Sequence, residues 1–154
     1  MTSLLAILTL ALTLASPARA TGARLPGTLP PDLDDHLADL DSGDRAKRRL
    51  AARALRSLVR GEVRRSSDQQ PDELARDAAR LTLTDLDARL APRCAQGLTS
   101  PELTIPCAEI LGSLETTWAL PALEQALALE QRHRARRRLD RTIALLRTYA
   151  VEDR

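Results

Sequence analysis

The chain has 154 residues and a formal net charge of +2, so its overall charge favours no particular class of partner. It contains no Phe, one Trp and one Tyr, and therefore Leu and Ala must build its core. Leu and Ala are strong helix formers, whereas the aromatic and β-branched residues that strands favour are scarce. This composition predicts an all-α protein and excludes a β-rich fold.

An apolar segment opens the chain. Leu4–Ala15 is interrupted only by Thr9 and Thr13, and an Ala-x-Ala cleavage pattern, Ala18–Ala20, follows it. The run is shorter than the ~20 residues that span a bilayer and has the length of a secretory signal. We therefore expect residues 1–20 to be a signal peptide and the protein to be exported, to the periplasm or out of the cell. Because no basic residue precedes the run, an uncleaved anchor or a buried N-terminal helix remains the alternative.

After the signal, residues 21–30 form a leader containing two Gly and two Pro, and residues 31–154 form one helical domain. No other apolar stretch is long enough to cross a membrane, so we expect no transmembrane segment after cleavage. A short acidic helix is predicted over 32–40. A second helix is predicted from a cap at Asp44 to about residue 59, with Gly61 as its C-terminal cap. Its predicted buried face comprises Leu50, Ala51, Ala54, Leu55 and Leu58.

A polar loop is predicted at 66–71, followed by a helix over 72–81. Thr84 and Asp87 resemble a capping box, which predicts an interruption at 82–84 and a new helix up to residue 98, kinked or split by Pro92. Ser100 and Pro101 are the predicted cap and first residue of the next helix. That helix is expected to reach residue 114, with Pro106 as a second possible kink.

Two helices complete the prediction, over 118–130 and 136–150. Residues 131–134 either continue the first of these or form a turn. The last helix has Leu139, Ile143, Leu146 and Ala150 on one face. The total is about seven helices in antiparallel pairs.

The helical pattern of Arg49–Leu58 returns in Ile105–Leu114 and, more loosely, in Thr142–Arg147. Such recurrence is typical of stacked helical arrays. The segment Leu111–Leu127, which reads Leu-Gly-x-Leu, a short turn and Ala-Leu-Pro-x-Leu, resembles a bacterial HEAT repeat, and so does Asp39–Leu55. The resemblance implies a right-handed stack of antiparallel helix pairs, an α-solenoid fragment that binds proteins. It implies no catalytic residue. Residues 62–90 depart from the pattern, and an Arg-rich stretch replaces the usual Asp-Pro turn after Leu127.

Cys94 and Cys107 stand equally far from the turn centred between Thr99 and Pro101. In an antiparallel helix pair this places them at the same height, where a disulfide can form after export. Such a bridge would stabilise the fold by about 3 kcal/mol. The alternative is two buried thiols that act as small core residues.

The charges are segregated along the chain. Residues 32–44 contain acids and no Lys or Arg, whereas residues 45–65 and 132–141 are rich in Arg. If both basic stretches lie on second helices of repeats, they form one basic face for an anionic partner such as an acidic protein, a lipid headgroup layer or an acidic polysaccharide. The alternative is that these arginines pair with neighbouring acids and stay solvated. The candidate partner-binding residues are Arg45, Arg49, Arg53, Arg56, Arg60, Arg134, Arg137, Arg138 and Arg141.

Trp118 either anchors a partner or fills a gap between helices. His36 and His133 stand among charged residues and are expected at the surface. We find no nucleophile–base set, phosphate loop or metal motif, and so expect no cofactor and no metal. Nucleic acid is disfavoured because stacking aromatics are lacking.

These patterns favour an exported, non-enzymatic module that binds another protein. Two alternatives remain open. One is an enzyme accessory or a lyase of the kind found among HEAT-like proteins, and the other is a structural envelope protein without a distinct ligand.

Overall fold

The computed structural model describes residues 29–152, and this part of the chain is helical without a strand. The prediction of an all-α protein is confirmed. The predicted signal peptide, residues 1–20, lies outside the described residues. The helices are α1 (Leu33–Leu40), α2 (Arg45–Ser66), α3 (Glu73–Gly97), α4 (Thr104–Ser113), the short 3-10 helix η1 (Thr117–Ala119), α5 (Leu120–Leu129) and α6 (His133–Glu152).

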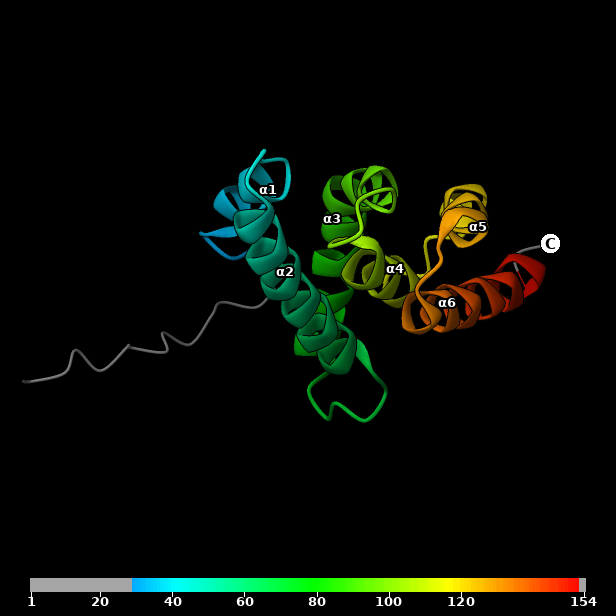
Figure 1. Cartoon of the computed structure of the whole chain (residues 1–154). Coiled ribbons are helices and arrows are strands. Elements are labelled where there is room, and N and C mark those ends of the chain that lie inside the picture. The colour runs from blue at the N-terminus through cyan, green and yellow to red at the C-terminus, as the bar shows by residue number, and fades with distance from the viewer. Residues whose placement is uncertain (1–28, 153–154) are drawn as a thin grey trace, which may run out of the picture.

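The helices form two rows. In Figure 1, α1, α3 and α5 lie along the upper side, and α2, α4 and α6 lie below them. Within the lower row α4 contacts both α2 and α6, and each lower helix also contacts the upper helix that precedes it in the chain. The short α4 is therefore flanked by two longer helices.

Leu and Ala build the core, as the composition requires. Eight of the twelve largest fully buried side chains in the described residues are leucines, and each leucine contributes about 1.5–3 kcal/mol through burial. Leu33, Leu37 and Leu40 of α1 and Leu139, Ile143 and Leu146 of α6 are buried on the predicted faces.

Helix α2 begins as predicted but continues further. The carboxylate of Asp44 accepts hydrogen bonds from the backbone amides of Ala46 (2.7 Å) and Lys47 (3.4 Å). The predicted cap at Gly61 is wrong, because the helix runs through it to Ser66. Val59, at the predicted end, and Glu62, three residues beyond it, are both buried, so the packed face continues past that end. Tertiary packing therefore overrides the local glycine signal.

The predicted buried face of α2 was also partly wrong. Leu50 is 65% exposed, and the buried positions are Ala51, Ala52, Leu55, Val59 and Glu62. Helix α2 contacts α1, α3 and α4, so the side of α2 that is buried depends on the positions of these three helices. A face that begins at Leu50 and one that begins at Ala51 both fit helical periodicity.

Helix α3 is one uninterrupted helix, and the predicted break at 82–84 is wrong. The hydroxyls of Thr82 and Thr84 donate to the carbonyls of Ala78 (3.0 Å) and Arg80 (3.2 Å), one turn earlier, and so remain inside the helix. Pro92 does not split the helix either, because it lies on the exposed side, where water can bind the carbonyl that lacks a partner. The described chain therefore has six α-helices rather than about seven.

Helix α4 begins later than predicted. Ser100 is not its cap and Pro101 is not its first residue, because the carbonyl of Ser100 accepts hydrogen bonds from Leu103 (2.9 Å) and Thr104 (3.0 Å) in a preceding turn. Pro106 lies in the first turn of α4, where a backbone amide has no helical partner, so no kink follows.

Helix α4 ends in a Schellman motif. The amide of Thr116 donates to the carbonyl of Leu111 (3.1 Å), and Glu115 adopts a left-handed conformation with φ 57°. This position usually carries Gly, because a Cβ there is strained. Glu115 therefore marks a strained backbone position beside the next turn.

Residues 131–134 do not continue the preceding helix: residues 131 and 132 connect the two helices, and residues 133 and 134 belong to α6. Helix α5 ends at Leu129 and α6 begins at His133, three residues before the predicted start.

Candidate functional site

Two adjoining hollows lie on the row formed by α2, α4 and α6. Their volumes are about 530 and 440 Å³, and Arg56, Ile105 and Arg134 line both. We call the two hollows together the arginine groove. Its lining residues are Arg45, Arg49, Arg53, Arg56 and Arg60 of α2, Pro101, Glu102, Ile105, Pro106 and Glu109 of α4 and the turn before it, and Arg132, His133, Arg134, Arg137, Arg138 and Arg141 of α6 and its approach.

All nine arginines predicted from the sequence line this groove. On α2 they recur at three- and four-residue intervals and therefore share one helix face. The arginines of α6 reach the same groove only because both helices pack against α4. The structure thus brings the two basic stretches together.

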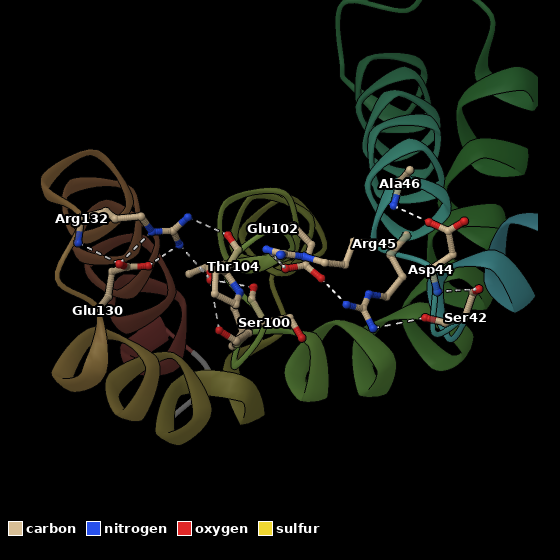
Figure 2. Close-up of polar contacts among 12 residues, drawn as sticks. Ser42, Asp44, Arg45, Ala46, Ser100, Glu102, Thr104, Glu130 and Arg132 are labelled. Atoms are coloured by element: carbon tan, nitrogen blue, oxygen red, sulfur yellow. Dashed lines mark hydrogen bonds and ion pairs between the residues drawn. The ribbon is translucent and has the colours of Figure 1, made fainter.

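Glu102 attaches α2 to the turn before α4. Its carboxylate forms ion pairs with Arg48 and Arg45 (3.6 Å for Arg45), and Arg48 also donates to the carbonyl of Ser42 (3.2 Å). Figure 2 shows this cluster beside the α2 N-terminus. The hydrogen bond to the Glu102 backbone amide, followed by the one to Arg48, lowers the pKa of the Glu102 carboxyl below its usual value.

Arg132 attaches the start of α6 to the same turn. Its guanidinium binds Glu130 through Nε (2.9 Å) and Nη2 (2.5 Å), while Nη1 donates to the carbonyl of Pro101 (2.8 Å), as Figure 2 shows. This two-point pair lowers the pKa of Glu130 to about 2, chiefly through the hydrogen bond from Arg132. The turn at 98–103 is therefore bonded to both sides of the groove.

Glu109 joins the two sides deeper in the groove. Its carboxylate accepts hydrogen bonds from Arg56 (2.7 Å) and Arg60 (3.1 Å) of α2 and forms an ion pair with Arg138 (3.0 Å) of α6. The Glu109 side chain is only 8% exposed. One carboxylate facing three guanidinium groups leaves a surplus of positive charge at the middle of the groove.

Other arginines of the groove have no acidic partner among residues 29–152. All of them are exposed: Arg49, Arg53, Arg134, Arg137 and Arg141. Within residues 29–151, the lining includes only two acids, Glu102 and Glu109. Ion pairs with neighbouring acids, which belong to one of the two alternatives from the sequence, therefore involve only part of the groove arginines, and these five are exposed to solvent.

Trp118 does not belong to the groove. It lies on η1, is 56% exposed and lines neither hollow, so it does not fill a gap between helices. Nε2 of His36 lies 3.4 Å from a carboxylate oxygen of Asp32, and His133 is exposed at the groove. Sequence analysis missed Glu102 and Glu109, because their arginine partners on α2 lie about fifty residues earlier in the chain. It also missed the role of Arg132, because its hydrogen bond to the carbonyl of Pro101 joins segments 31 residues apart.

The two cysteines lie near each other between α3 and α4. Both are fully buried, and a hydrogen bond between the thiols, followed by burial, raises the pKa of Cys94. Sγ of Cys107 lies against Gly97 of α3, since a Cβ added to Gly97 would stand 3.1 Å from this sulfur. Gly97 lies one helical turn after Cys94, so the two cysteines are neighbours across the α3–α4 contact. The disulfide stays a prediction.

The described helices include none with the length and hydropathy needed to span a bilayer. No family model, curated protein or solved structure matches the chain. The arginine groove must therefore be interpreted from its own geometry and charge.

Proposed function

We propose that the chain is an exported, non-enzymatic helical-repeat module that binds an acidic surface of another protein through the arginine groove. The observation that carries this proposal is the convergence of arginines from α2 and α6 on one groove whose lining contains two acids. Like charges gathered at a concave site attract an anionic partner and raise its rate of association.

We also propose that the helices form a HEAT-like stack of antiparallel pairs. The contacts of α1 with α2, α3 with α4 and α5 with α6, together with those of α4 with α2 and α6, support this arrangement. The Leu-Gly-x-Leu segment at the end of α4 also supports it. In such a stack the second helix of each pair lies on one surface, which is the surface that contains the groove.

Export is proposed from the apolar run at Leu4–Ala15 and the cleavage pattern at Ala18–Ala20. An exported protein meets proteins and surfaces of the cell envelope. The partner is therefore expected in that compartment.

Binding would use a surface that is formed in advance. Glu102 and Glu109 orient Arg45, Arg56 and Arg138 by direct contacts, so fewer side chains lose freedom when the partner arrives. The exposed, unpaired arginines then supply the attraction. Because they are solvated, the affinity should decrease as salt is added.

The test is affinity capture from the native envelope with quantitative mass spectrometry. The groove variant is Arg49→Glu with Arg53→Glu, two arginines without an acidic partner in the described structure. The control is Lys47→Glu with Arg147→Glu, which makes the same charge change outside the groove lining.

We expect the wild-type protein and the control to capture the same partner and the groove variant to lose it. Circular dichroism establishes that all three are folded. An identical set of captured proteins for all three would refute the proposal.

A further inference from the structure

We propose that the arginine groove accepts an extended acidic peptide segment of about seven residues with an aliphatic residue at its centre, and this inference rests on the proposed function. The supporting observations are the length of the groove, the composition of its lining and the position of its apolar residues.

The length follows from α2. The arginines of this side run from Arg45 to Arg60, which at 1.5 Å per residue is about 22 Å of helix. An extended chain rises about 3.3 Å per residue, so about seven residues cover that length. The two hollows share Arg56, Ile105 and Arg134, so an extended chain that passes these residues can contact the linings of both.

The lining distinguishes an acidic peptide from other polyanions. No Phe, Tyr or Trp lines either hollow, so bases have no side chain on which to stack. A lipid surface is broad, whereas these hollows are recessed between two helices. Guanidinium groups match carboxylates in two-point pairs, as Arg132 and Glu130 already show in this chain.

The unpaired arginines stand on both sides of the path. Arg49 and Arg53 belong to α2, and Arg134, Arg137 and Arg141 belong to α6. Carboxylates on successive side chains of an extended peptide point to opposite sides. An acidic segment can therefore pair with both helices at once.

The apolar centre follows from Ile105. It lines both hollows, is half-buried, and lies between Glu102 and Glu109 in sequence, with Pro106 next to it. An aliphatic side chain placed over Ile105 removes apolar surface of both partners from water. A purely acidic segment would not use this contact.

The experiment measures fluorescence anisotropy of a labelled heptapeptide with three acidic residues on each side of a central leucine. A matched peptide carries serine at the centre. The protein variants are Arg53→Glu with Arg137→Glu, one unpaired arginine from each side, and the control Lys47→Glu with Arg147→Glu.

We expect the wild-type protein to bind the leucine peptide, with an affinity that decreases as salt is added. The groove variant should bind at least about tenfold more weakly, and the control should bind within about twofold of wild type. The serine peptide should bind about threefold or more weakly than the leucine peptide.

Three outcomes would overturn the inference. Equal affinity for the two peptides would reject the apolar centre. Absence of peptide binding, alongside groove-dependent capture of an envelope protein, would reject the extended segment and leave the proposed function intact. Tighter, groove-dependent binding of phosphatidylglycerol vesicles or of a sulfated oligosaccharide would assign the groove to another class of partner. It would therefore reject both the extended acidic segment and the proposed function.

Discussion

Replacement of Glu109 tests whether the two sides of the arginine groove are held together by one carboxylate. The substitution Glu109→Gln preserves the shape of the side chain and removes its charge. Three guanidinium groups, from Arg56, Arg60 and Arg138, then lose their shared anionic partner and face one another. We expect the folded state to be destabilised.

The magnitude follows from the contacts and their exposure. A hydrogen bond to a charged group contributes about 1.5–3 kcal/mol, whereas an exposed ion pair contributes about 0–1 kcal/mol. Glu109 is almost buried but its three arginines are 32–51% exposed, so each contact lies toward the lower value. The loss should therefore be about 2 kcal/mol, which lowers Tm by about 6–10 °C for a domain of this size.

The assay is urea unfolding followed by circular dichroism, with Glu124→Gln as the matched control. Glu124 pairs with Arg147 at 2.7 Å, but both side chains are about half exposed, so the control should change stability by less than about 0.5 kcal/mol. A double-mutant cycle of Glu109→Gln and Arg56→Gln should give a coupling energy of about 1 kcal/mol.

Two results would contradict this reasoning. One is a Glu109→Gln protein as stable as the Glu124→Gln control, and the other is a coupling energy of zero. Either would show that Glu109 does not join the two sides of the groove.

Three further predictions concern the turn after α4, the pair beside α6 and the cysteines. Glu115→Gly should stabilise the fold by about 0.5–1 kcal/mol because it relieves the left-handed backbone strain at φ 57°. Glu115→Ala keeps a Cβ and should not stabilise it. Thermal unfolding of the two variants measures the difference, and equal Tm values would contradict the strain. Glu130 has a folded-state pKa of about 2 against about 4.3 when unfolded, so its contribution is present above pH 4.3 and lost as the pH falls toward 2. Glu130→Gln should therefore lower stability near neutral pH and approach wild type in acid, and a constant difference across the pH range would contradict the role of Arg132. Denatured, unreduced protein should show no free thiol, because we expect Cys94 and Cys107 to form a disulfide after export. Reduction of this disulfide should lower the free energy of unfolding by about 3 kcal/mol. Two titratable thiols in the unreduced protein would reject the disulfide.

Local signals in the sequence determined much of the fold. The scarcity of aromatic residues predicted helices, the cap at Asp44 located the start of α2, and the leucine spacing located the buried faces of α1 and α6. Each of these signals acts within one or two helical turns. The local sequence is therefore sufficient to predict these helix starts and buried faces.

Where local signals compete with one another, packing between helices decided the outcome. Gly61 and Thr82 resemble helix ends, yet α2 and α3 continue through them because their far turns pack against other helices. Leu50 fits an apolar face but remains exposed, since α1, α3 and α4 together cover a different side of α2. These outcomes depend on partners that local periodicity does not specify.

The candidate site divides in the same way. The sequence by itself determined which arginines are clustered and, from helical spacing, which of them share a face of α2. Only the tertiary structure decided that Arg53 and Arg137 line one groove, that Glu109 joins its two sides, and that Arg132 binds the turn before α4. The physical reason is range: helix propensity and capping act between neighbours in the chain, whereas the charge at a surface is the sum over helices that the core brings together.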